Sequence, residues 1–256
     1  MQKRDQEQRQ LGTDGKGRRD DIMFDWRFAI ETFPKLLEGL PTTFFIGAIS
    51  CIIGMVIAVW VAMTRVYGIP VFKQIGIAYV SIGRGTPLLI QMYMFYYGLP
   101  LILNAIIHLF GGTHTFTFQS FPPMITAVIT FAFNVGAYVS EYFRSAILAV
   151  DYGQVEAAKS IGIGRMKIFF RIVLPQATMI ALPNLCNTFS IMIKATTLVF
   201  TITIVEVFAK AKLAAALNLK YFEVYISSMF VFWIITFLLE RIFAVIEKKA
   251  MVKGIV

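Results

Sequence analysis

The sequence predicts an all-α membrane protein that crosses the bilayer about five times. Hydrophobic residues make up 57% of its 256 residues and charged residues only 15%, whereas soluble domains average about one half and one quarter. The mean hydropathy is +0.70. Two long stretches, 40–64 and 85–140, contain no Asp, Glu, Lys or Arg. Because about 20 apolar residues are enough to span a bilayer as a helix, these stretches predict transmembrane helices.

The chain is expected to consist of three parts. Residues 1–21 have mixed charge and almost no apolar side chains, which is typical of a disordered polar tail. Residues 22–39 are predicted to form an amphipathic lead-in helix at the membrane interface, with Trp26 and Phe33 as anchors. Residues 40–250 carry the predicted spans and are expected to form one transmembrane domain.

Five apolar runs supply the predicted spans, at roughly 40–63, 86–110, 124–150, 172–193 and 224–246. In the first run Gly, Ser and Ala recur every three or four residues, which predicts a face that another helix approaches closely. The second opens with Thr86 as the expected N-cap and Pro87 at the first helical position. Pro175 and Pro183 predict a kink in the fourth. The segment 195–205 is too short to cross and is predicted to be a short helix or a re-entrant piece.

Basic residues predict the side of the membrane on which each loop lies. The loops 65–84 and 151–171 and the C-terminal end are rich in Lys and Arg, whereas the loop 111–123 is uncharged. Under the positive-inside rule the basic loops and the C-terminus are cytoplasmic, and an odd number of spans then places the N-terminus outside. Lys and Arg in the tail 1–21 favour the opposite side for that tail. Since the net charge of +9 is concentrated between the spans, it does not predict nucleic-acid binding.

One of the loops, with the start of the next span, forms a basic stretch at 155–177 that glycines interrupt. Its first part, VEAAKSI, favours a helix that stops at Gly162 and Gly164, because glycine readily adopts left-handed backbone angles. The second part has an apolar stripe at helical spacing, formed by Met166, Phe169, Phe170 and Val173. The residues alone leave two interpretations: a loop that rests on lipid headgroups, or a helix–turn–helix that docks on a partner.

The same stretch resembles the EAA motif of permease subunits of ATP-binding-cassette importers. In that motif a Glu-Ala-Ala helix, a glycine and a later Ile-x-Leu-Pro form the helix that docks on the ATPase. The residues that match at the family's spacing are Gly153, Gln154, Glu156, Ala157, Ala158, Gly162, Ile172, Leu174, Pro175, Gln176 and Ala177. Segments 84–100, 137–147 and 194–198 resemble the polar amino-acid branch of this family, although Ala195 stands where an acidic residue is frequent.

This resemblance implies a bacterial inner-membrane permease subunit of an ATP-driven amino-acid importer of type I. The segment 151–175 would hold the cytoplasmic coupling helix. The implied ATPase-coupling residues are Gly153, Glu156, Ala157, Ala158 and Gly162. A cassette ATPase homodimer would bind ATP and Mg, so no cofactor is expected in this chain itself. An external solute-binding protein, a second permease copy or sister subunit, and membrane lipid complete the implied set of partners.

The implied substrate is a polar amino acid delivered by the external binding protein into the cytoplasm. The segment NLKYFE at 218–223 resembles permeases for cystine and related sulfur compounds, and a basic amino acid is the alternative. The chain is not expected to be an enzyme, since it has no G-x-x-x-x-G-K-[ST], no H-E-x-x-H and no paired catalytic carboxylates within a span. The alternative function is a secondary transporter or channel not coupled to ATP, but those proteins usually have two related halves, and this sequence has no repeat.

Two polar groups within the spans are candidates for the substrate path. Asn134, Tyr138 and Glu141 lie at i, i+4 and i+7, so they share one face of the third span. Ionisable groups that face hydrocarbon are costly, which favours a protein-lined or water-filled path along this face. The alternative for Glu141 is a structural clamp with Arg144 or Arg84.

The second polar group consists of Asn184 and Thr188, which share one face of the fourth span. Its alternative role is to satisfy backbone groups that Pro183 leaves free. No catalytic residue and no metal site is predicted. The two histidines have no neighbours that would supply further ligands, and the two cysteines lie in apolar runs where they are expected to be packing residues.

Overall fold

The computed structural model of the protein describes residues 24–252, and within this range it is all-α, with no strand. The helical elements are α2 (Trp26–Leu37), α3 (Leu40–Val66), α4 (Phe72–Gly85), α5 (Leu88–Leu109), α6 (Pro123–Ala149), α7 (Tyr152–Ser160), α8 (Arg165–Ile168), the π-helix η1 (Phe169–Val173), α9 (Leu174–Ala195), the 3₁₀-helix η2 (Thr196–Ile202), α10 (Val207–Asn218) and α11 (Tyr221–Val252). The predicted fold class is confirmed. The predicted polar tail 1–21 lies outside the described residues.

Five helical stretches in the described part of the chain are long and apolar enough to cross a membrane. They are Leu40–Val66, Leu88–Leu109, Pro123–Ala149, Arg165–Ile202 and Tyr221–Ala250. Each coincides with a predicted span, so the expected number is confirmed. The fourth is longer than predicted because α8 and η1 precede α9 and η2 follows it. The helix η2 also confirms the short helix expected within 195–205.

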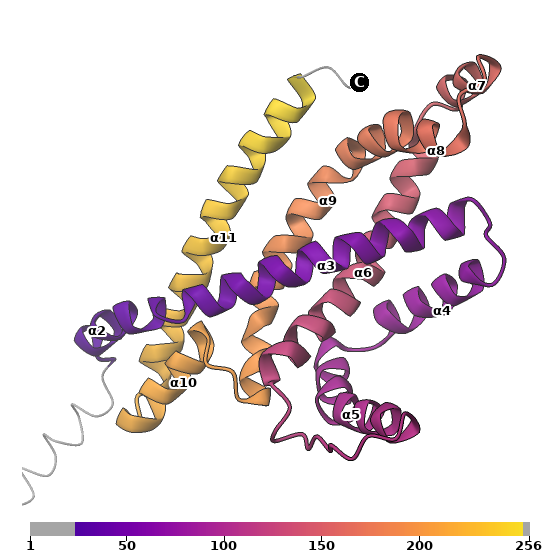
Figure 1. Cartoon of the computed structure of the whole chain (residues 1–256). Helices are drawn as coiled ribbons and strands as arrows, with labels where there is room; N and C mark the ends of the chain where they lie inside the picture. The colour runs from indigo at the N-terminus through magenta and orange to yellow at the C-terminus, as the bar shows by residue number, and fades with distance from the viewer. Residues whose placement is uncertain (1–23, 253–256) are drawn as a thin grey trace, which may run out of the picture.

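Helix α6 forms the centre of the bundle. In its most apolar part 61% of the residues are buried, against 11% in α11. It packs against α3, α4, α5 and α9, and Figure 1 shows α3 crossing in front of α6 and α9, with α11 alongside α9. The same view places two small regions at opposite ends of the molecule. We call them the α7 end (residues 152–168) and the α10 end (residues 26–37 and 203–220).

Small residues let α3 and α6 lie close together, as predicted for the first span. A Cβ added at Gly54 would lie 2.7 Å from the Val135 side chain, and one at Gly136 would lie 3.3 Å from the Gly54 carbonyl oxygen. The Ser50 hydroxyl donates a hydrogen bond to the Val128 carbonyl at 3.3 Å. Larger side chains would force these two helices apart.

The structure corrects the expected loop 65–84, because most of it forms α4. The Tyr79 hydroxyl donates to the Phe133 carbonyl at 2.7 Å, and a Cβ added at Gly83 would lie 2.5 Å from the Ala137 Cβ. Helix α4 therefore runs back along α3 and ends opposite the middle of α6. A helix of 14 residues rises only about 21 Å, so its length did not distinguish it from a loop in the sequence.

Helices α4 and α5 are separated by a break at Thr86 and Pro87. Thr86 is the C-cap of α4, and its hydroxyl donates to the Ile82 carbonyl at 2.7 Å. The prediction that Thr86 caps the start of the next helix is therefore wrong. Helices α4 and α5 are therefore separate elements, joined by two residues in extended conformation.

Helix α2 lies within the expected lead-in 22–39, with some residues buried and others exposed. The Asp25 carboxylate caps it by accepting a hydrogen bond from Phe28 N at 2.9 Å. Thr32 and Leu36 are buried against the protein, whereas Trp26 is 66% exposed. Its position at a membrane interface stays a prediction.

Candidate coupling and translocation sites

The helix–turn–helix predicted within 155–177 is present at the α7 end. The Asp151 carboxylate caps α7 by accepting from Gly153 N at 2.9 Å. The helix ends where Gly162 takes a φ of +77°, and Ile163 N donates back to the Ala158 carbonyl at 3.1 Å. No heavy atom lies within 4 Å of a Cβ added at Gly162. The backbone angle, rather than lack of space, is what favours glycine there.

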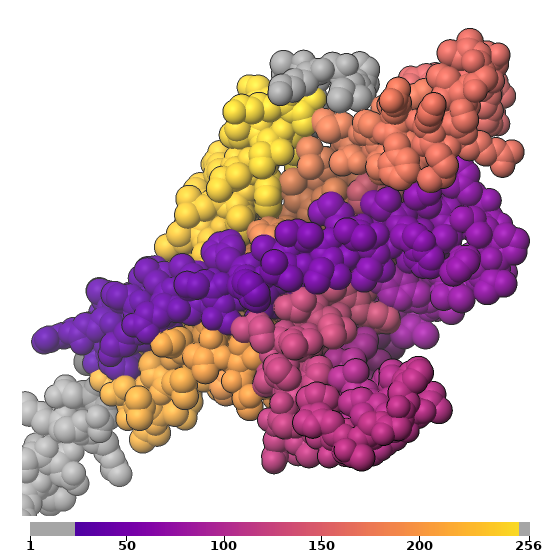
Figure 2. All heavy atoms as spheres, viewed as in Figure 1, coloured from indigo at the N-terminus to yellow at the C-terminus, as the bar shows by residue number. Residues whose placement is uncertain are grey.

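The predicted coupling residues divide between two faces of this segment. Ala158 is 6% exposed and belongs to the main hydrophobic core, together with Ile168 and Phe169 of the following turn. Gly153, Glu156 and Ala157 are exposed, and so is Gly162 at the turn. One alanine therefore anchors the helix to the bundle while its neighbours remain open to a partner. Figure 2 shows this segment projecting from the molecule.

A side-chain pair ties α7 to the start of α9. Gln176 Nε2 donates to Gln154 Oε1 at 2.7 Å, and both glutamines belong to the EAA-like stretch. The predicted apolar stripe after the turn is only half buried, because Phe169 and Val173 face the core while Met166 and Phe170 are exposed. The exposed pair adds apolar surface to the side that α7 presents.

Glu141 is held between two arginines near the end of α6. Arg65 donates to one carboxylate oxygen, and Arg144 Nε donates to the other at 2.9 Å. The Arg65 and Glu141 side chains are only 15% and 16% exposed. The structure thus brings together the predicted Glu141–Arg144 pair and adds Arg65, which sequence reasoning missed. Arg84 instead lies over the ring of Tyr138, with its guanidinium carbon 5.5 Å from the ring centroid.

The predicted close approach of α3 to another helix was the one feature of the sequence that could have suggested Arg65 as a partner of Glu141. The pairing residues are 76 positions apart, so no local spacing reveals them. The small-residue face of α3 predicted a close helix partner, and Arg65 lies at the end of that helix. A carboxylate one span away is the charge that a half-buried arginine requires.

Asn134, the first member of the predicted polar stripe, lies at the break between α4 and α5. Its amide donates to the Gly83 carbonyl at 3.3 Å and to Gln91 Oε1 at 3.0 Å. Gln91 Nε2 donates to the same Gly83 carbonyl at 2.9 Å and to the Thr86 carbonyl at 3.1 Å. In an unbroken helix the Gly83 carbonyl would accept from residue 87, but Pro87 has no N–H. The side-chain amides of Asn134 and Gln91 therefore supply the hydrogen bonds that the Gly83 carbonyl lacks because of the proline.

The predicted stripe is therefore not one continuous open face. Asn134 is buried at 6% exposure, Tyr138 is 36% exposed and Glu141 is occupied by the two arginines. In the fourth span the Thr188 hydroxyl donates to the Asn184 carbonyl at 2.8 Å, with Thr188 buried and the Asn184 side chain exposed. Tyr138 and Asn184 are the predicted path residues that the structure leaves accessible.

Sequence reasoning also missed Glu206, a fully buried carboxylate at the α10 end. It caps α10 by accepting hydrogen bonds from Phe208 N and Ala209 N, each at 2.8 Å. The signal for it was a single glutamate followed by a good helix-forming run, VFAKAKLAAALN.

Comparisons with known proteins agree with this geometry. The family model described as "Binding-protein-dependent transport system inner membrane component" matches residues 54–252. A probable amino-acid ABC transporter permease protein, PatM of Vibrio harveyi, is 35% identical over 86% of this chain and 93% of its own length. The L-cystine transport system permease protein TcyB of Bacillus subtilis (strain 168) is 38% identical over 88% of this chain and 90% of its own length.

A solved structure has the same arrangement of helices. It is a crystal structure of an amino acid ABC transporter with histidines, and its matching chain is 27% identical with a TM-score of 0.74. The match covers 89% of this chain and 100% of that chain. Most of the fold described above is thus shared with a chain of a solved transporter.

Proposed function

The chain belongs to the family of binding-protein-dependent transport system inner membrane components, and on this premise we propose that it couples ATP hydrolysis in a partner to import of an amino acid. Its relatives include permease proteins of amino-acid ABC transporters, so the chain is a transport subunit rather than an enzyme. The proposed partners are a cassette ATPase homodimer that binds ATP and Mg, and a solute-binding protein on the outer side. A second permease copy or a sister subunit completes the membrane part.

The α7 end is the observation that supports this proposal most strongly. Helix α7 is short, capped at its start by Asp151 and closed at its end by the left-handed turn at Gly162. Ala158 and the Gln154–Gln176 pair connect it to the bundle, while Glu156 and Ala157 stay exposed. A partner that grips the exposed face moves the helix as one body. That motion passes to α6 before it and α9 after it, which pack on each other.

The proposed substrate is a polar amino acid, with cystine the first choice and a basic amino acid the second. The 38% identity to an L-cystine permease protein supports this order. Tyr138 and Asn184 are the proposed first contacts along the path, since both are accessible. We propose an indirect role for Asn134, Glu141 and Thr188, whose hydrogen bonds and ion pairs hold the helices that line the path.

The proposed location is the bacterial inner membrane, with the α10 end outside and the α7 end and C-terminus in the cytoplasm. A chain with its two buried cysteines, Cys51 and Cys186, replaced would carry a single new cysteine at Lys35 or at Lys249. A membrane-impermeant maleimide added to intact inner-membrane spheroplasts should label the first and spare the second. Labelling of both from outside would contradict this topology.

The decisive experiment reconstitutes the chain with its cognate ATPase and binding protein and follows ATP hydrolysis and uptake of cystine or arginine. Glu156→Lys should abolish the stimulation of hydrolysis by loaded binding protein, because it reverses a charge on the exposed face of α7. Lys249→Glu is the matched control, since it also reverses an exposed charge on the proposed cytoplasmic side but lies in α11 rather than α7. Equal stimulation in wild type and Glu156→Lys would refute the coupling role, and uptake without any ATPase would favour a secondary transporter.

A further inference from the structure

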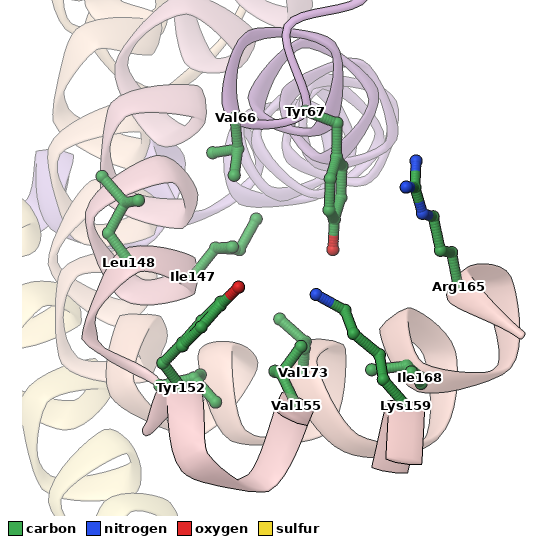
Figure 3. A pocket seen from close by; sticks show the side chains of 11 residues that line it. Val66, Tyr67, Ile147, Leu148, Tyr152, Val155, Lys159, Arg165, Ile168 and Val173 are labelled. Atoms are coloured by element: carbon green, nitrogen blue, oxygen red, sulfur yellow. The ribbon is translucent and has the colours of Figure 1, made fainter. Parts of the chain in front are cut away.

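A cavity of about 380 Å³ lies between α7 and the bundle. Figure 3 shows α7 and α8 on one side of it and the ends of α3 and α6 on the other. Its apolar wall includes Ile147, Leu148 and Val173. The cavity faces the bundle side of α7, so it is separate from the exposed Glu156 face to which coupling is assigned above.

The polar side chains that line this cavity are one lysine, one arginine and two tyrosines, all of which can donate hydrogen bonds. Figure 3 shows the Lys159 ammonium and the hydroxyls of Tyr67 and Tyr152 directed into the same space. The Lys159 nitrogen lies 5.2 Å from the centroid of the Tyr152 ring. Arg165 adds a second positive charge at the border, and no Asp or Glu is among the lining residues. Two cationic side chains and two hydroxyl donors without a carboxylate are suited to an anion with several acceptor oxygens.

The position of the cavity favours a lipid as the source of that anion. Val66 ends one candidate span, Leu148 lies at the end of another, and Arg165 begins a third. Where several spans end together, the hydrocarbon gives way to the headgroup layer. Leu148 and Tyr152 are 62% and 61% exposed beside the cavity, which leaves apolar surface for the glycerol and upper acyl carbons.

We propose that this cavity binds the phosphate of an acidic phospholipid, with Lys159 and Arg165 supplying the charge and Tyr67 and Tyr152 the hydroxyl donors. A net-neutral lipid is less suitable, because its ammonium group would enter a site with two cations and no acid. Basic pockets between transmembrane helices on the cytoplasmic side bind acidic headgroups in this manner. On the proposed function, a lipid seated here bridges α7 to α3 and α6 and stiffens the helix that receives the ATPase.

The test measures lipid binding to the purified full chain without any ATPase. Nanodiscs of phosphatidylcholine with increasing phosphatidylglycerol would be assembled with wild type, Lys159→Gln and Lys167→Gln, and the co-purified phosphatidylglycerol would be counted by native mass spectrometry. Lys159→Gln should weaken phosphatidylglycerol binding about fivefold, the contribution of one lysine near an anionic surface. Lys167→Gln removes an equal charge from the same segment but not from the cavity, so it should bind as wild type does. Lys159→Arg should restore binding.

Three results would overturn the proposal. Equal retention of phosphatidylglycerol in wild type and Lys159→Gln would show that Lys159 does not bind the lipid. A loss of phosphatidylglycerol in Lys167→Gln as large as that in Lys159→Gln would show that only diffuse surface charge attracts it. Displacement of phosphatidylglycerol by inorganic phosphate alone would indicate a free-anion site rather than a lipid site. Because the lipid count uses no transport assay, its failure leaves the proposed import function standing.

Discussion

The two ends of this molecule are built in opposite ways. At the α10 end, contacts join segments that are far apart in the sequence: Lys220 Nζ lies 2.5 Å from Asp25 Oδ2, Lys210 Nζ lies 2.7 Å from Glu38 Oε2, and the Ser227 hydroxyl donates to the Ala29 carbonyl at 2.8 Å. At the α7 end, a nine-residue helix is held by one buried alanine and a glutamine pair. The α10 end is therefore held by several contacts between distant segments, whereas most of the surface of α7 stays accessible.

Two further features make the α10 end rigid. Glu206 is fully buried and caps α10, and Gly39, between α2 and α3, packs on the backbone of Glu206 and Val207. The glycine at the α7 end, Gly162, has open space around it and is required for its backbone angle alone. Gly39 is thus required because of packing, and Gly162 because of its backbone angle.

Gly39→Ala should produce the largest loss of stability. A Cβ at Gly39 would lie within 2.7 Å of Val207 Cα, and backbone cannot move aside as a flexible side chain can. Overpacking of this kind should lower the free energy of unfolding by about 3 kcal/mol, seen as a lower melting temperature of the purified chain in detergent. Gly98→Ala is the control, because nothing lies within 4 Å of that position in α5 and alanine favours a helix. A melting temperature of Gly39→Ala equal to that of wild type would contradict the rigid α10 end.

Glu206 should make stability at the α10 end depend on pH. Burial raises the pKa of its carboxyl to about 7 from an ordinary 4.5, although hydrogen bonds from Phe208 N and Ala209 N favour the charged form. The folded chain therefore holds this proton more tightly than the unfolded chain. The resulting stability is fully present below pH 4.5 and is lost as the pH rises through about 7.

The measurement compares wild type with Glu206→Gln, which cannot titrate. The unfolding free energy of wild type, relative to that of Glu206→Gln, should be about 2 kcal/mol larger at pH 5 than at pH 8. Comparison with Gln cancels the contributions of the other acids at this end. A difference that stays constant over this range would show that the Glu206 carboxyl does not change its protonation on unfolding.

Glu141→Gln should have an intermediate effect, near the α7 end of α6. It leaves two arginines without their carboxylate, of which the Arg65 side chain is 15% exposed. The expected loss is about 1.5 kcal/mol in unfolding free energy. Glu31→Gln breaks the Arg27–Glu31 pair, whose side chains are 86% and 58% exposed, and should change stability very little. Full stability together with altered substrate preference in Glu141→Gln would assign Glu141 to the path rather than to a clamp.

Gly162→Ala should have the smallest effect on the folded chain. A left-handed backbone angle costs an alanine about 1 kcal/mol, and no clash adds to it. Gly164→Ala is the matched control, because Gly164 has a φ of −66° and equally open surroundings. Differential scanning fluorimetry of both variants should show a small decrease for the first and none for the second. A large decrease for Gly162→Ala would mean that the α7 end is as tightly built as the α10 end.

Much of the fold could be predicted from the sequence because the membrane imposes a simple pattern. Apolar runs of sufficient length located the five spans, and Gly162 located the end of α7. Helix α4 could not be found in this way, since a short helix with lysine and arginine near its ends has the same composition as a basic loop. Gly76 and Gly83 let α4 pack closely on α3 and α6, and this role is visible only once the three helices are placed together.

The candidate site was predictable only where neighbours in sequence are also neighbours in space. The Glu141–Arg144 pair, at i and i+3, could be read from the helix period, whereas the pair with Arg65 depends on tertiary packing. Asn134 is a polar residue within a span, as a path residue would be. Only the structure shows that its amide donates to the Gly83 carbonyl at the break before Pro87. Polar residues in a span thus have two uses that composition does not separate.

The shortness of helix α4 has a consequence for biogenesis. Helix α4 rises only about 21 Å, which is shorter than the hydrocarbon core, and it carries Lys73 and Arg84 near its ends. A helix this short and charged is a poor substrate for insertion machinery that selects long apolar runs. Its partners Phe133 and Ala137 belong to α6, which leaves the ribosome later. The contacts between α4 and α6 can therefore form only after α6 has been synthesised, whereas those between α4 and α3 can form earlier.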